Sequence, residues 1–241
     1  MSQPLSANAF LAALRAEGVV ITQHDGWRTH NRGDRGDGWG PVHGIVIHHT
    51  AGVGDRMVTY CINGDGEDGK LPGPLCHGLI RKDGTFHTIG YGRTNHAGAG
   101  DAKVLRAVIA EFPLPKPQEN TVDGNARFYG LECENEGNGN DPWPARQIDT
   151  IIRASAAICR AHGWGEVGDT SVIGHKEWQV GKPDPRGIDM DDLRVRIRER
   201  LQHPPFWTPP TTLYYRMNVA EETLAHHEKR LAALEKEDSP T

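Results

Sequence analysis

The stretch Gly44-Ile-Val-Ile-His48-His49-Thr-Ala-Gly52 decides the fold of this chain. Its apolar residues run without polar alternation, which is typical of a strand buried on both faces in the centre of an α/β sheet. Successive side chains of a strand point to opposite faces, so only one of His48 and His49 can face a given site. A single histidine ending a buried strand is usually structural, whereas a pair followed by Thr-Ala-Gly favours a functional site.

A second strand is predicted by the sequence Phe128-Tyr-Gly-Leu-Glu-Cys-Glu-Asn-Glu136. Its period of two places Glu132, Glu134 and Glu136 on one face. A row of carboxylates on a central strand is costly unless it faces a site or solvent. The pattern therefore leaves two interpretations, a strand that borders a site and an exposed edge strand.

The third informative stretch runs from Val172 to Asp189, a short apolar strand followed by a turn-rich loop. Loops that follow a rigid strand often carry functional residues. This loop contains His175 and, nine residues later, Asp184, a pair compatible with two ligands of one zinc ion. Asp189 and Asp191 compete with Asp184 for the carboxylate position, and a third ligand must come from elsewhere.

Hydrophobic periodicity and turn signals define the other elements. They predict helices over 6–17, 54–61, 101–112, 144–162 and 190–202, and a β-hairpin over 76–89 that turns at Asp83-Gly84. Together with the buried strands, these elements predict an α/β protein with helices flanking a central sheet.

The expected domain organisation has four parts. Residues 1–40 form a helix and loop that pack on the main domain, 41–203 form that domain, and 204–210 form a Pro-rich linker. Residues 211–241 carry an a/d heptad pattern that predicts a coiled-coil-like helix. A lone helix of this length is marginal in water, so we expect it to form a homo-oligomer or to pack on another surface.

Composition excludes several classes of protein. The chain has 241 residues and a formal net charge of −5, which gives no electrostatic case for a nucleic-acid partner. No apolar run approaches the roughly 20 residues that cross a bilayer, and the N-terminus lacks the pattern of a signal peptide. We therefore expect synthesis in a cytoplasm. The four scattered cysteines are expected to be free thiols.

Taken together, the motifs resemble the type-2 zinc-dependent N-acetylmuramoyl-L-alanine amidases, a family that includes T7-type lysozymes and peptidoglycan recognition proteins. The resemblance covers roughly residues 25–200 and is carried, in the family's order, by Ile45-Val-Ile-His48-His49-Thr-Ala, Cys76-His77-Gly-Leu-Ile-Arg-Lys-Asp-Gly-Thr, Asn95-His96-Ala-Gly98, Gly130-Leu-Glu132, Gly174-His175 and Lys182-Pro-Asp184. The stretches at Trp27-Arg-Thr and Leu71-Pro-Gly-Pro-Leu-Cys look most like endolysins of actinobacterial phages.

The resemblance implies a central mixed, mostly parallel sheet and a site with defined roles. The zinc ligands would be His48, His175 and Asp184, and three protein ligands leave one position open for water. Asp184 stands where some relatives have Cys. Glu132 would act as general base and later as acid, in preference to Glu134 and Glu136, and Lys182 would stabilise the oxyanion.

Other positions would line the substrate cleft. Thr50, Asn95, His77 and His96 are the expected substrate-binding residues, with structural support as the alternative for the latter two histidines. T7-type relatives have a catalytic Tyr where this chain has Cys76. That thiol is expected to be a bystander near the zinc, and the alternative is a fourth ligand that closes the site.

The implied activity is hydrolysis of the amide bond between the lactyl group of N-acetylmuramic acid and L-alanine. Peptidoglycan would be the partner and zinc the cofactor. As a phage endolysin, the protein would stay in the host cytoplasm until membrane pores released it to the cell wall. The alternatives are a peptidoglycan-binding module without turnover, which would lose zinc ligands, and a cytoplasmic amidase that recycles anhydromuropeptides.

Overall fold

The computed structural model describes residues 2–36, 38–65 and 71–208. The chain divides into two units, Met1–Phe206 and Trp207–Thr241, and the description below concerns the first. The predicted heptad helix over 211–241 lies outside the described residues. Within the described ranges, no helix is long and apolar enough to cross a membrane.

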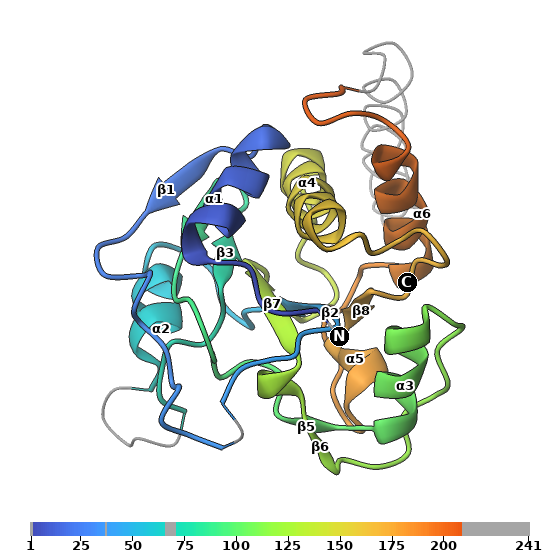
Figure 1. Ribbon diagram of the computed structural model, residues 1–241. Coiled ribbons are helices and arrows are strands. Elements are labelled where there is room, and N and C mark those ends of the chain that lie inside the picture. Colours follow the sequence, from blue (N-terminus) through green and yellow to red (C-terminus); the bar gives the residue numbers. More distant parts are fainter. Residues whose placement is uncertain (1, 37, 66–70, 209–241) are drawn as a thin grey trace, which may run out of the picture. The chain divides into compact units, whose positions relative to one another are not determined.

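A six-stranded sheet forms the centre of this unit, in the order β1-β4-β3-β7-β2-β8 (Figure 1). The strands are β1 (Ile21–Gln23), β2 (Gly44–His49), β3 (Gly78–Ile80), β4 (Phe86–Thr88), β7 (Phe128–Cys133) and β8 (Val172–Gly174). All neighbouring pairs are parallel except the predicted β3–β4 hairpin. The predicted α/β fold with a mixed, mostly parallel sheet is therefore confirmed.

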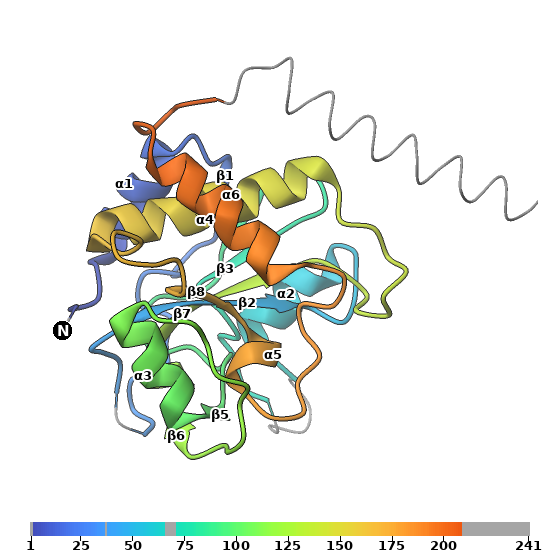
Figure 2. The same cartoon turned by 90° about the vertical axis from the view of Figure 1, so that its right-hand side faces the viewer.

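Helices cover both faces of the sheet. One face carries α1 (Ala7–Ala16), α4 (Ala145–His162) and α6 (Met190–Leu201), and the other carries α2 (Arg56–Asn63), α3 (Ala102–Ala110) and the short α5 (His175–Trp178) (Figures 1 and 2). A two-stranded sheet pairs β5 (Ala99–Gly100) with β6 (Val122–Asp123). Strands β1, β5 and β6 are too short to show a period, and the sequence did not predict them.

The alternation of side chains along β2 assigns one hydrophobic cluster to each face. Ile45 and Ile47 belong to the cluster that contains core residues of α1, α4 and α6. Val46, between them, belongs to the cluster that contains core residues of α3 and α5. The next residue in phase with Val46 is His48, so the same alternation aims His48 at the face that carries α5.

The helix ends follow the sequence signals closely. Pro144 precedes the first residue of α4, and Gly163 ends that helix in the left-handed conformation with a φ of 68°. The Asp189 carboxylate accepts hydrogen bonds from the backbone N–H groups of Asp191 and Asp192 and so caps α6. Asp189, one of the candidate metal ligands in the sequence, therefore has a structural role as a helix cap.

Glu17 links α1 to α4 and α6 and gives a first prediction. Its side chain is buried and accepts hydrogen bonds from Arg160 Nε at 2.8 Å and from Arg200 Nε at 2.6 Å. Glu17→Ala would remove this carboxylate from the buried Arg200 and the partly buried Arg160. It should therefore lower the free energy of unfolding by about 3–5 kcal/mol. Urea unfolding measures this. Glu199→Ala, an exposed change on α6, should stay within about 0.5 kcal/mol, and equal losses would contradict the assignment.

Candidate metal centre and active site

Strands β2 and β7 bring the first two site residues together. His48 and Glu132 are register partners on these adjacent parallel strands. On β7, Phe128 packs in the cluster of α3 and α5, and the period of two puts Glu132 on that same face. The interpretation of this strand as one that borders a site therefore holds for Glu132. The alternative of an exposed edge strand is wrong, because β7 lies between β3 and β2.

The three glutamates of this stretch have separate environments because β7 ends at Cys133. The buried Glu134 carboxylate accepts hydrogen bonds from Arg81 Nε and from the Gly54 backbone N–H, both at 2.6 Å. Glu136 is exposed. Glu132 is the one of the three that lines a cavity together with His48.

The turn after β8 positions His175. This residue begins helix α5, whereas the sequence predicted a loop at this position. The difference has a local cause, since the Glu177 carboxylate accepts a hydrogen bond from the Gly174 N–H at 2.8 Å and stabilises the first turn. Arg194 holds the Glu177 carboxylate with two hydrogen bonds of 2.9 and 3.0 Å.

Asp184 returns to the same place from the loop that follows α5. The Lys176 backbone N–H donates a hydrogen bond of 2.7 Å to the Asp184 carbonyl. The Lys176 ammonium group donates to the Ile188 carbonyl at 2.8 Å and so secures the far end of the loop. These contacts hold the Asp184 carboxylate opposite His175.

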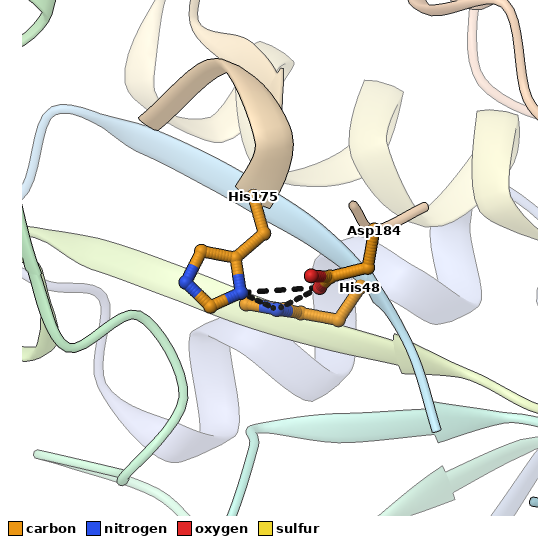
Figure 3. A group of neighbouring side chains, drawn as sticks. All are labelled: His48, His175 and Asp184. Atoms are coloured by element: carbon orange, nitrogen blue, oxygen red, sulfur yellow. Dashed lines mark hydrogen bonds and ion pairs between the residues drawn. The ribbon is translucent and has the colours of Figure 1, made fainter. Parts of the chain in front are cut away.

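Three donor atoms converge at this point (Figure 3). His48 Nδ1, His175 Nδ1 and Asp184 Oδ2 lie 3.1 Å from one another in all three pairs. All three residues are buried. Tetrahedral zinc with bonds of about 2.0 Å separates neighbouring ligands by about 3.3 Å. The donor set, two imidazoles and one carboxylate, therefore fits a metal ion such as zinc in both chemistry and spacing.

This is the one group of three or more close metal-binding side chains in the described ranges. His49, on the opposite phase of β2, accepts a hydrogen bond from the Arg186 N–H at 3.0 Å. Asp191, the other competing carboxylate, forms an ion pair with Arg194. The predicted set of His48, His175 and Asp184 is the set that the structure brings together.

The electrostatics of the group favour metal binding over protonation. Burial and the neighbouring His175 lower the pKa of His48 to about 4, so its imidazole is neutral at pH 7. Burial by itself would raise the pKa of Asp184, but hydrogen bonds with His175 and His48 outweigh it and hold that pKa well below the usual range. The site thus offers a neutral imidazole and a carboxylate, the forms that coordinate a metal.

A cavity of about 340 Å³ opens at these donors. It is lined by the three donor residues, by Glu132 and Lys182, and by His49, Thr50, Ala51, Tyr60, Cys61, Leu71, Leu75, Asn95, His96 and Pro183. Glu132 Oε2 is buried and has no hydrogen-bond partner in the protein. Burial, then the negative charge of Asp184, raises the pKa of Glu132 to about 8, and Lys182 acts in the opposite direction. A carboxyl group whose pKa is raised towards neutral pH in this way suits proton transfer.

The predicted substrate-binding residues divide into two groups. Thr50, Asn95 and His96 line the cavity. His77 is not among the residues that line the cavity, and its side chain is fully buried elsewhere. His77 Nε2 contacts the Gly92 carbonyl at 2.9 Å, and its Nδ1 accepts a hydrogen bond from the Gly130 N–H at 2.9 Å. These contacts favour the alternative of structural support for His77.

Cys76 lies outside the donor group as well. Its thiol is fully buried and is not among the cavity-lining groups. Burial raises its pKa well above the usual value, and a hydrogen bond with Cys61 acts in the same direction. A neutral, buried thiol is a poor metal ligand, so the geometry favours the bystander role for Cys76.

The buried His77 ring gives a prediction for stability against pH. Burial lowers its pKa to about 3, compared with 6.5 in an exposed state. Because the unfolded chain then binds the proton more readily, stability is present above pH 6.5 and falls as the pH drops towards 3. In chemical unfolding of the metal-free protein, His77→Gln should reduce this slope by up to about 1.4 kcal/mol per pH unit. If the dependence of stability on pH were unchanged in His77→Gln, a group other than His77 would be responsible for it.

Several cavity residues were not predicted from the sequence. Tyr60 and Cys61 come from helix α2, and Leu71 and Leu75 come from the loop before β3. Gln179 accepts a hydrogen bond from His175 Nε2 at 2.8 Å. The spacing of four residues between His175 and Gln179 could have predicted this contact. That spacing is informative only once a helical turn is known to begin at His175.

The mixed, mostly parallel sheet thus carries a His-His-Asp donor group that could hold one metal ion, and the partly buried Glu132 carboxyl lines the same cavity. Residues 38–187 match the Amidase_2 model, described as N-acetylmuramoyl-L-alanine amidase. The chain belongs to this family. A search of curated proteins finds no match.

Several solved structures are similar to this chain. The endolysin N-acetylmuramoyl-L-alanine amidase LysCS from Clostridium intestinale is 19% identical, with 73% of this chain and 94% of that chain covered and a TM-score of 0.47. The amidase AmiD from E. coli is 16% identical, with 75% and 66% covered and a TM-score of 0.48. Drosophila PGRP-LB is 14% identical, with 78% and 98% covered and a TM-score of 0.47.

Proposed function

We propose that this chain is a zinc-dependent N-acetylmuramoyl-L-alanine amidase that cleaves the amide bond between the lactyl group of N-acetylmuramic acid and L-alanine. The observation that carries the proposal is the triangle of His48 Nδ1, His175 Nδ1 and Asp184 Oδ2, with Glu132 lining the same cavity. Membership in the amidase family supports the choice of substrate.

His48, His175 and Asp184 would hold the zinc ion. Bound there, zinc would supply Lewis acidity, which polarises a carbonyl oxygen and makes water a stronger acid. The Glu132 carboxylate, which lines the cavity, takes the proton of the attacking water. It returns that proton to the alanine nitrogen as the C–N bond breaks, leaving a carboxylate on the lactyl group and a free amine on the peptide.

Lys182 contributes charge rather than proton transfer. Its side chain lines the cavity, and its positive charge acts on both Glu132 and His48. An ammonium group in this position stabilises negative charge that develops on the carbonyl oxygen during attack. Thr50, Asn95 and His96 lie on the cavity wall, where they are placed to contact the sugar or the peptide.

The biological role that we propose is host lysis by a phage endolysin. The Trp27 and Leu71 stretches, which look like those of actinobacterial phage endolysins, support it. In this role the protein remains in the host cytoplasm until membrane pores release it to the wall. The proposed organisation has residues 1–40 packing on the 41–203 domain, a linker over 204–210, and a segment 211–241 that either forms a homo-oligomer or contacts the wall or membrane.

Digestion of purified cell walls tests the activity. Mass spectrometry should detect soluble stem peptides that begin with a free L-alanine amine, and glycan strands that keep their lactyl carboxylate. A chelator should abolish this release, and added zinc should restore it. Cleavage at a glycosidic bond, or release that persists without metal, would contradict the proposed reaction. Wall binding without any release would favour a binding module.

A further inference from the structure

The imidazole of His48 must present a lone pair on Nδ1 to the donor triangle. A neutral imidazole carries one proton, on either ring nitrogen. If that proton sat on Nδ1, it would point at His175 Nδ1 and Asp184 Oδ2, both 3.1 Å away, and the site would lose a ligand. Some group must therefore keep the proton on His48 Nε2.

His96 is in contact with that nitrogen. Its Nδ1 lies 3.1 Å from His48 Nε2, and its own Nε2 lies 3.2 Å from the carbonyl oxygen of Phe128. A carbonyl can only accept a hydrogen bond, so His96 Nε2 carries the proton. With the Nε2 proton donated to the Phe128 carbonyl, the lone pair of a singly protonated His96 ring lies on Nδ1 and faces His48 Nε2, where it can accept that nitrogen's proton.

The surrounding structure fixes the His96 ring in this orientation. The Asn125 side-chain oxygen accepts hydrogen bonds from the backbone N–H groups of His96 and Ala97, each at 2.8 Å. The ring lies against the backbone of Gly130, where an added Cβ would be 2.4 Å from His96 Cγ. Any side chain at position 130 would displace the His96 ring. The glycine at this position therefore provides the space that the ring occupies.

The geometry points to His96 as a positioning residue that sets the tautomer of His48, through a hydrogen-bonded chain from His48 Nε2 to His96 and on to the Phe128 carbonyl. His175 has a matching acceptor in Gln179 Oε1, at 2.8 Å from its Nε2. Partners of this kind orient metal-binding histidines, and their loss weakens metal affinity by about 10–100-fold. The inference rests on the proposed metal site and gives His96 a role besides lining the cavity.

Two measurements on the full-length chain test this role. The first is zinc affinity by chelator competition. His96→Phe keeps an aromatic ring but removes the acceptor nitrogen, and it should bind zinc about 10–100-fold more weakly. His96→Gln restores an acceptor oxygen and should recover affinity relative to His96→Phe. The control is His162→Phe, which makes the same change at a partly buried histidine that contacts Tyr129 Oη. This variant should bind zinc as the wild type does.

The second measurement is long-range ¹H–¹⁵N NMR of the metal-free protein, which reports the tautomer of His48 directly. The wild type should carry the proton on Nε2, and His96→Phe should show a shift towards Nδ1. Wild-type zinc affinity in His96→Phe together with an unchanged His48 tautomer would overturn the inference. A wild-type protein that binds no zinc would contradict the proposed function, while the tautomer measurement would still decide the role of His96.

Discussion

Glu132→Gln should lower kcat by about 10²- to 10⁴-fold, the range that general acid–base catalysis contributes. The amide keeps the shape of the carboxyl group but cannot take a proton from water at neutral pH. Zinc affinity should remain close to that of the wild type, because Glu132 is not in the donor group. The readout is initial rate of peptide release together with zinc content.

Glu136→Gln is the matched control, since it makes the same change at an exposed position four residues further on, and it should leave kcat unchanged. Stability gives a second readout. In the metal-free protein, the pKa of Glu132 is raised from 4.5 to about 8, so the wild type loses stability as the pH rises through that interval. Glu132→Gln should not show this loss. A variant that retains wild-type kcat would remove Glu132 from the mechanism.

Asp184→Ala should show the second large effect, a loss of activity on the order of 10³-fold or more through loss of the metal and its Lewis acidity. The substitution removes one of three donors and leaves His48 and His175 with a weaker, two-ligand site. Isothermal titration with zinc and the rate of peptide release should therefore fall together. High zinc concentrations should recover only part of the activity.

Asp189→Ala provides the comparison, because Asp189 was a competing ligand candidate and instead caps α6. It should keep zinc binding and activity, and it should lose about 1 kcal/mol of stability, as expected for an N-cap. The reverse result, with zinc binding lost in Asp189→Ala and kept in Asp184→Ala, would show that Asp184 is not the carboxylate ligand.

The sequence predicted those helices and strands that have a long hydrophobic pattern or a strong local signal at their ends. The unbroken apolar run ending at His48 indicated a buried strand, and the Pro144 and Gly163 signals bounded α4. Strands such as β1, with three residues, are defined by pairing with β4, and such pairing leaves no pattern in a single stretch. The same applies to α5, whose first turn depends on a carboxylate held by Arg194 from α6.

The candidate site shows the same division. A motif resemblance named His48, His175, Asp184 and Glu132, and the fold brings all four to one cavity. The sequence left His77 and His96 as equivalent wall residues. They differ because the ring nitrogens of His77 contact backbone groups, whereas His96 Nδ1 faces His48. That distinction depends on side-chain orientation, which spacing along the chain does not encode.

Anomalous diffraction at the zinc edge, from crystals grown with zinc, tests the central claim most directly. The account predicts one strong peak about 2.0–2.2 Å from His48 Nδ1, His175 Nδ1 and Asp184 Oδ2, with Cys76 uncoordinated and Glu132 outside the ligand set. A peak coordinated by Cys76 or through His48 Nε2, or no peak at this group, would contradict it.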